Sequence, residues 1–192
     1  MKINVELNSQ SIRKAIEALT TAKKQLQGQM FNELLKRSCD EIKSLANERV
    51  MLTDVGYNVK QDIINGWRPV QYTGNTAKWY GAKLVNQASK AVYIEFGVGI
   101  RGQQSPHNNA AETGYQYNLP SDKKLADGSW IFRIEDDADL DISLKNIDSK
   151  TAHSVRTKGQ TAYMYLYNAI IDFRDRQSAK KIWTDIKREY WG

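Results

Sequence analysis

The stretch Ala91-Val92-Tyr93-Ile94-Glu95-Phe96-Gly97-Val98-Gly99 separates two parts of the chain that differ in composition. The residues before it show the hydrophobic periods of helices and strands, whereas residues 97–129 carry few large apolar side chains and many Gly, Asn, Gln and Ser. The apolar run ahead of Gly97 predicts a short helix that ends there, although its alternating β-branched and aromatic residues also suit a strand. We expect a rigid scaffold that presents residues 97–129 as an extended flexible loop.

Length and composition predict one globular domain over residues 1–192, since 41% of the residues are hydrophobic and 26% are charged. No apolar run approaches the roughly 20 residues that span a bilayer, so no contact with a membrane is expected. The single Cys39 cannot form an internal disulfide, which fits a reducing cytosol or a particle assembled inside a cell. The net charge of +6 would favour polyanions such as DNA, but 28 basic and 22 acidic residues spread it thinly.

The N-terminal part predicts a short strand followed by long helical structure. Residues 3–7 alternate apolar and polar side chains, the pattern of a half-buried strand. Ser9 is a plausible N-cap for a helix that runs to about Gln27 with apolar residues every three to four positions. Gly28 either bends one long helix or separates it from a second helix that runs to about Val50.

Alternating apolar residues predict a small, mainly antiparallel sheet. We expect a strand within residues 62–72 and its hairpin partner within residues 79–85, then two further strands at residues 130–134 and 140–144. From Thr161 the helical period returns and predicts one long C-terminal helix. The expected fold class is therefore α+β, with a long N-terminal helix or helix pair and a long C-terminal helix packed on the small sheet, and a long flexible loop.

The sequence Gly97-Val98-Gly99-Ile100-Arg101-Gly102 matches the G-x-G-x-x-G pattern of dinucleotide-binding folds. That pattern holds a pyrophosphate only between a strand and a periodic helix of a βαβ unit, and neither surrounds it here. We therefore expect no cofactor and assign no cofactor-binding residues. The glycines are expected to supply turns and a hinge.

Two other candidate sites, a calcium-binding loop and a catalytic histidine, also lack the residues that they require. Residues 135–141 hold five carboxylates, spaced in part like the start of a calcium loop, but Ile142 stands where that loop needs glycine. A solvated acidic turn is the better interpretation. His107 and His153 lie in polar segments without a nucleophile or carboxylate at a recognisable spacing. We assign no catalytic and no metal-binding residues, and do not expect an enzyme.

Two segments carry a family resemblance. Residues 83–86 followed by Tyr93-Ile94-Glu95-Phe96-Gly97-Val98-Gly99 resemble the most recognisable stretch of the bacteriophage neck and minor tail protein family, where a Tyr, aliphatic, Glu, aromatic, Gly series follows a strand. Residues 159–169 are similar to that family's approach to a helix near its end. Val98 stands where the family often has Thr, and the segment after Gly99 is unusually long.

The resemblance implies a structural subunit of a long-tailed bacteriophage or prophage, a tail-completion or head-to-tail joining protein. Such proteins form rings, typically hexameric, between the connector and the tail tube, with no cofactor and no turnover. The implied partners are further copies of the chain, connector or head-completion proteins and tail-tube proteins, with non-specific contact to passing DNA. The implied location is the virion, and the host cytoplasm before assembly.

Eight residues are expected at an interface with a neighbouring subunit or partner: Tyr93, Glu95, Phe96, Gly97, Gly99, Arg101, Lys123 and Lys124. Tyr93 and Phe96 are also expected to anchor the short helix in the core. Glu95 either caps or pairs within the subunit, or contacts the next subunit. Arg101, Lys123 and Lys124 would line a channel through which DNA passes.

A basic nucleic-acid-binding module is the alternative function. Trp67 and Trp79 would then stack on bases beside the positive helices. Tryptophans in a predicted hairpin are more often part of a packed core, which favours the structural interpretation.

Overall fold

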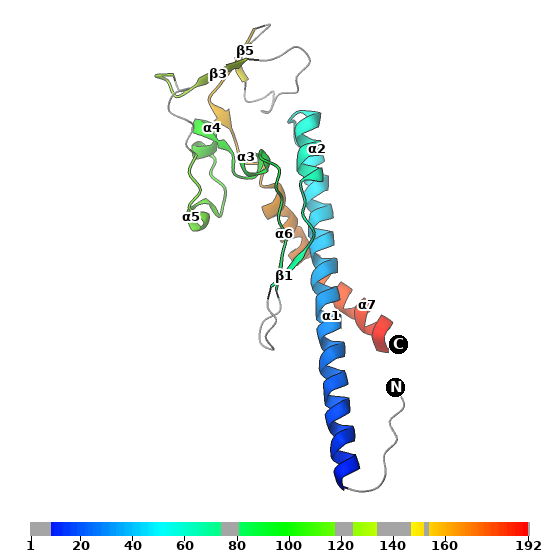
Figure 1. The fold of residues 1–192 in the computed structure, drawn as a ribbon. Helices are drawn as coiled ribbons and strands as arrows, with labels where there is room; N and C mark the ends of the chain where they lie inside the picture. The colour runs from blue at the N-terminus through cyan, green and yellow to red at the C-terminus, as the bar shows by residue number, and fades with distance from the viewer. Residues whose placement is uncertain (1–8, 74–80, 118–124, 134–146, 152–153, 192) are drawn as a thin grey trace.

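A computed structural model describes residues 9–73, 81–117, 125–133, 147–151 and 154–191 of the chain. The fold is α+β as predicted, with a long N-terminal helix, helices at the C-terminal end and small antiparallel sheets (Figure 1). The helices are α1 (Ser9–Met51), α2 (Tyr57–Asn65), α3 (Ala91–Phe96), α4 (Gly99–Gln104), α5 (Ala110–Thr113), α6 (Tyr165–Asp175) and α7 (Ser178–Trp191). The strands are β1 (Gln71–Thr73), β2 (Gly81–Lys83), β3 (Trp130–Arg133), β4 (Ile147–Lys150), β5 (Ser154–Thr157) and β6 (Gly159–Gln160). None of the described helices has the length and apolar character that crossing a membrane requires.

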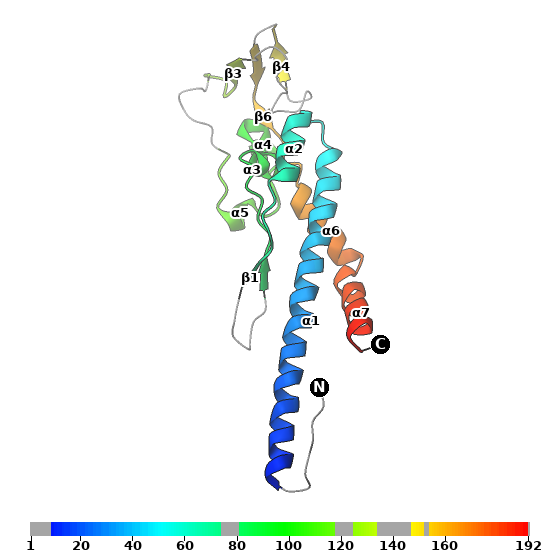
Figure 2. The same cartoon turned by 45° about the vertical axis from the view of Figure 1, so that its right-hand side comes forward.

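Helix α1 is one continuous helix of 43 residues, so Gly28 neither ends it nor separates it into two. Its second half packs against α6 and α7. Its first half extends beyond every other labelled element in both views (Figure 1 and Figure 2). No side chain between residues 13 and 29 is buried, whereas Met30 is fully buried. Among the side chains that the structure describes, those of α1 that are buried against other elements therefore lie in its second half.

The last turn of helix α2, residues 62–65, lies where the start of a strand was predicted. Val59 and Ile63 are four positions apart and both are buried, so the segment uses a helical face against the core. The strand propensity of the β-branched residues is overridden by this packing. The hairpin itself is confirmed, because β1 and β2 pair antiparallel with Tyr72 opposite Ala82.

The second sheet has the strand order β3-β5-β4 with antiparallel neighbours. Figure 2 shows it at the opposite end of the molecule from the start of α1. The prediction of a strand at residues 130–134 is confirmed by β3. Strands β4 and β5 were not predicted, because their segment is polar and, among the residues described in these two strands, Val155 is the one fully buried apolar side chain. The strands predicted at residues 3–7 and 140–144, and the acidic residues 135–141, lie outside the described residues.

The C-terminal end forms two helices, so the prediction of one long helix is wrong. Gln177 has φ 53°, and this left-handed residue interrupts the helical hydrogen bonds between α6 and α7. The break lets both helices pack on α1. On α7, the Trp183 ring stacks on Phe31 with a centroid distance of 5.5 Å.

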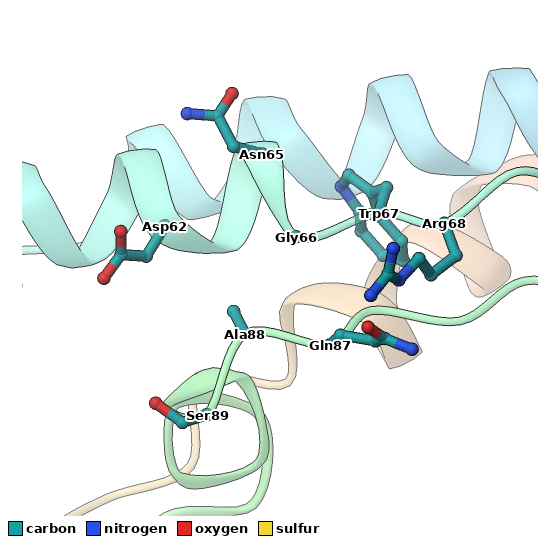
Figure 3. A pocket seen from close by; sticks show the side chains of 8 residues that line it. All are labelled: Asp62, Asn65, Gly66, Trp67, Arg68, Gln87, Ala88 and Ser89. Atoms are coloured by element: carbon teal, nitrogen blue, oxygen red, sulfur yellow. The ribbon is translucent and has the colours of Figure 1, made fainter.

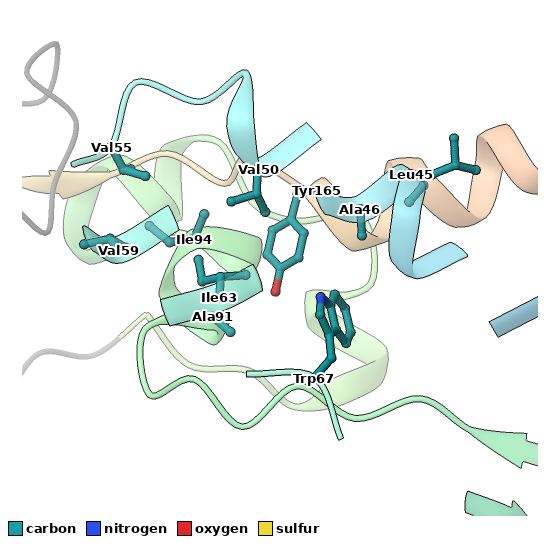
Figure 4. Close-up of a cluster of buried hydrophobic side chains, with 11 residues drawn as sticks. Leu45, Ala46, Val50, Val55, Val59, Ile63, Trp67, Ala91, Ile94 and Tyr165 are labelled. Atoms are coloured by element: carbon teal, nitrogen blue, oxygen red, sulfur yellow. The ribbon is translucent and has the colours of Figure 1, made fainter. Parts of the chain in front are cut away.

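The hydrophobic core lies where α1, α2, α3 and α6 meet (Figure 4). Its buried residues are Leu45, Ala46, Val50, Val55, Val59, Ile63, Trp67, Ala91, Ile94, Tyr165 and Ala169. Trp67 is 8% exposed and its Nε1 donates to Oδ1 of Asn47 over 2.7 Å. The packing interpretation is confirmed for Trp67, and Trp79 lies outside the described residues.

Candidate functional site

The end of α3 lies directly against the start of α6, although the two segments are far apart in the sequence. The backbone N–H of Tyr163 donates to the carbonyl of Ile94 over 2.9 Å, and that of Met164 donates to the carbonyl of Glu95 over 3.1 Å. We call residues 91–97 and 159–167 together the α3–α6 junction. It joins the two segments that carry the family resemblance into one packed unit.

The Glu95 side chain caps helix α6. Its Oε2 accepts the N–H of Leu166 over 2.8 Å, and its Oε1 accepts the N–H of Tyr167 over 2.9 Å. Met164, at the N-cap position, makes no side-chain cap of its own. The first N–H groups of a helix lack partners and carry partial positive charge, so a carboxylate is stabilised there. Glu95 therefore has the intramolecular role among the two that were expected.

His107 is the third partner of the same carboxylate. Its Nε2 lies 3.0 Å from Oε1 of Glu95, and its Nδ1 accepts the backbone N–H of Asn109 over 3.0 Å. Because Nδ1 accepts, the ring hydrogen is on Nε2 and is donated to Glu95. The sequence shows no carboxylate at a recognisable spacing from His107, and the fold supplies one. The partner is 12 residues away and reaches the imidazole only through the fold.

Aromatic rings surround this hydrogen-bonded group. Phe96 lies between His107 and Tyr115, with ring centroid distances of 4.3 Å and 4.7 Å. The hydroxyl of Tyr115 donates to the carbonyl of Gly97 over 2.7 Å, and burial raises the pKa of this phenol to about 12. The rings exclude water, which strengthens the polar contacts inside.

Tyr165 completes the enclosure from α6. It is fully buried, and its pKa is raised first by burial and then by the negative charge of Glu95. Glu95 and His107 are themselves buried, and every oxygen of the carboxylate is already hydrogen-bonded. The arrangement is suited to holding three segments together rather than to proton transfer with a substrate.

The prediction of an irregular loop is wrong for the described residues after Gly97. Helices α4 and α5 form there, and His107 and Ala110 are buried. Short helices of this kind depend on tertiary contacts, and α4 packs against β6. Residues 118–124 lie outside the described residues.

Gly97 and Gly99 act by close packing as well as by turning, so the hinge interpretation is corrected. Gly97 has φ 79° and ψ 176°, a region that only glycine adopts readily. A Cβ at this position would lie 2.6 Å from the carbonyl oxygen of Gln160 and 2.7 Å from the nitrogen of Ala162. Val98 and Gly99 form antiparallel bridges with Gln160 and Gly159. The glycines therefore let two backbones approach at the junction.

Tyr93 and Phe96 have different environments. Tyr93 is 48% exposed on the outer side of α3, so its expected place in the core is wrong, whereas Phe96 is half-buried at the junction. Ala91 and Ile94 anchor α3 instead, because these two residues face the core.

Arg101 lies on α4 and its side chain reaches β4 of the second sheet. Its Nη2 pairs with Oδ1 of Asp148 over 2.5 Å, and its backbone N–H donates to the carbonyl of Lys158 over 3.3 Å. Arg101 therefore makes contacts within the chain, and its expected place in a channel stays a prediction. Lys123 and Lys124 lie outside the described residues.

An open pocket of about 410 Å³ lies between the end of α2 and the chain leading into α3 (Figure 3). It is lined by Asp62, Asn65, Gly66, Trp67, Arg68, Gln87, Ala88 and Ser89. The lining offers one carboxylate, one guanidinium and neutral hydrogen-bonding groups, but no nucleophile with an adjacent base. Within the described part of the chain, no group of three or more His, Cys, Asp or Glu side chains is placed to hold a metal ion.

Comparisons with known proteins leave the function open. No protein-family model, no curated protein and no solved structure matches this chain. The function is therefore inferred from the α3–α6 junction, the exposed apolar side chains and the residues that carry the resemblance.

Proposed function

We propose that this protein is a structural subunit of a bacteriophage or prophage particle, a tail-completion or head-to-tail joining protein that forms a ring between the connector and the tail tube. The α3–α6 junction carries the proposal. Residues 93–99 and 159–169 resemble the same family, and they lie against each other with Glu95 capping α6. Two chance resemblances would have no reason to meet at one place in the fold.

The exposed apolar side chains of the subunit support an assembly role. Ile16 and Leu19 on α1 are each 58% exposed, and Val92 and Tyr93 on α3 are each 48% exposed. Apolar groups in water favour association, because contact with a partner removes their surface from solvent. Their position on separate elements suits a subunit with more than one neighbour.

In this role the protein is not an enzyme and works without a cofactor. Its partners are further copies of itself in a ring, typically a hexamer, together with connector or head-completion proteins and tail-tube proteins. DNA passing through the ring would be contacted without sequence specificity, and no membrane is involved. The protein would be found in the host cytoplasm before assembly and in the virion afterwards.

The alternative of a nucleic-acid-binding module receives no support from Trp67. Its indole is buried and hydrogen-bonded to Asn47, so its ring faces are used inside the core. Base stacking needs an exposed ring.

The test is assembly of the purified protein. Light scattering and native mass spectrometry over a wide concentration range should show a ring of fixed stoichiometry, and the protein should bind tail tubes that lack their completion protein. A chain that stays monomeric at high concentration and binds neither tail tubes nor connectors contradicts the proposal. Affinity for DNA that falls steeply with salt, without ring formation, would favour the nucleic-acid module instead.

A further inference from the structure

The first half of α1 carries no buried side chain over residues 13–29, and we call these residues the arm. Ile16, Leu19 and Leu26 lie on one helical face, which continues into the fully buried Met30. The same face of the helix is therefore buried at Met30, partly buried at Leu26 and exposed at Ile16 and Leu19. At about 1.5 Å per residue the arm is roughly 25 Å long.

The arm is also basic. Its charged side chains are Arg13, Lys14, Glu17, Lys23 and Lys24, all of them exposed, which gives a net charge of +3. Two arms placed against each other would bring these like charges together, so a symmetric arm-to-arm contact is disfavoured. A partner surface with exposed apolar groups and acidic side chains fits the arm best.

The second half of α1 presents such a surface. Asp40, Ser44 and Glu48 follow one another at four-residue intervals and are all exposed, so they form one row on the outside of the helix. The row leads to exposed large apolar side chains at the corner between α1 and α2. We call the following residues the outer strip: Asp40, Ser44, Glu48, Met51, Leu52 and Tyr57.

The outer strip borders the side of α1 that packs on α6 and α7. Glu41 is hydrogen-bonded to Ser178 of α7, and Arg49 pairs with Asp172 of α6, whereas Asp40, Ser44 and Glu48 remain exposed. Leu52 is 86% exposed and Tyr57 is 61% exposed. Lys36 is the nearest basic residue on the same row, at the end closer to the arm.

We infer that the arm of one subunit docks on the outer strip of a second copy of this chain. The inference rests on the proposed function and names the contact that joins neighbouring subunits. Basic side chains of the arm meet Asp40 and Glu48, while Ile16 and Leu19 meet the apolar corner of the strip. Because the two surfaces differ, the contact is head-to-tail and repeats from copy to copy. It gives a closed ring when the rotations between successive copies add up to one full turn.

Charge reversal with rescue tests this contact in the full-length protein. The double variants Lys23→Glu with Lys24→Glu, and Asp40→Lys with Glu48→Lys, should each weaken subunit association at least about tenfold at low salt. Combining all four substitutions in one chain restores opposite charges across the contact and should restore association to within about threefold of wild type. Sedimentation velocity over a concentration series measures both effects.

The matched control is the double variant Lys180→Glu with Lys181→Glu, which makes the same charge change at exposed positions of α7. It should assemble like wild type. All substituted side chains are exposed, so thermal unfolding midpoints should agree and exclude misfolding as the cause.

The outcomes separate the inference from the proposed function. Assembly that forms normally in both double variants overturns the inference and leaves the ring proposal standing. Loss of assembly without recovery in the fourfold variant overturns the pairing of arm and strip. A chain that is monomeric at every concentration overturns both. If the Lys23 and Lys24 variant assembles but fails to bind tail tubes, the arm binds a tail protein and not a second copy.

Discussion

The imidazole of His107 donates to the carboxylate of Glu95 over 3.0 Å, and both backbone hydrogen bonds at the start of α6 end on that same carboxylate. Glu95 therefore links α3, the segment that follows Gly97, and the C-terminal helices. A buried carboxylate persists only when its hydrogen-bonding capacity is used, and here three donors use it. Removing it would leave those donors without an acceptor.

Substitution of Glu95 should destabilise the fold strongly. Glu95→Ala leaves two backbone N–H groups and one imidazole N–H unpaired in a buried site, and should lower the free energy of unfolding by about 3 to 5 kcal/mol. Glu95→Gln retains one acceptor and the volume, and should cost about 1 to 3 kcal/mol. Urea denaturation followed by circular dichroism measures both values.

Glu112→Gln is the control for Glu95, since Glu112 is an exposed glutamate on α5. Its change in unfolding free energy should stay within about 0.5 kcal/mol. If Glu95→Ala were as stable as Glu112→Gln, Glu95 would not be the cap that holds the junction together.

The close backbone approach at Gly97 gives a second prediction. Gly97→Ala places a methyl group 2.6 Å from the carbonyl oxygen of Gln160 in a conformation that disfavours it, and should cost about 2 to 5 kcal/mol. Gly114→Ala is the matched control, because Gly114 also has positive φ, at 66°, but nothing lies within 4 Å of an added Cβ. It should cost about 1 to 2 kcal/mol. Equal losses in the two variants would mean that conformational strain alone, and not close packing, explains Gly97.

Strong local patterns predicted part of this fold. The long apolar period of α1, the short apolar run of α3 ended by Gly97 and the β1–β2 hairpin are encoded by neighbouring residues. Helix α2 was missed because its residues 62–65 have strand propensity, and the burial of Val59 and Ile63 on one helical face overrides it. The break between α6 and α7 falls at Gln177, a residue type that does not mark a left-handed position in the sequence.

The centre of the candidate site could be predicted only in part. Glu95 stood out as a carboxylate among apolar neighbours, which indicated a need for a partner. His107 gave no signal, since its contact with Glu95 depends on the path of α4 and the residues that follow. Contacts of this kind are set by tertiary structure, which periodicity does not describe.

Tyr115 predicts a specific loss of stability at alkaline pH. The pKa of its phenol is about 12 in the folded protein and about 10 in the unfolded chain. Burial is the main cause of the increase, and the nearby Tyr93 and Tyr117 add to it. Between these values the unfolded state binds fewer protons, so stability is unchanged by this group below about pH 10 and falls as pH rises toward 12. Absorbance titration at alkaline pH should show one late phenol fewer in Tyr115→Phe than in the wild type, since the pKa of the buried Tyr165 is also raised. If both proteins titrate alike, Tyr115 is not enclosed as described.

Cys39 should be protected from thiol reagents in the folded protein. It is buried on α1, and its pKa is raised first by burial and then by the negative charge of Asp40. The thiolate is the reactive form, so a raised pKa and poor access both slow the reaction at pH 8. A disulfide reagent should react with Cys39 much more slowly in the native protein than in urea, and Asp40→Asn should speed the native reaction modestly by lowering the thiol pKa. Cys39→Ser gives the background rate, and a native rate equal to the rate in urea would show that this face of α1 opens readily.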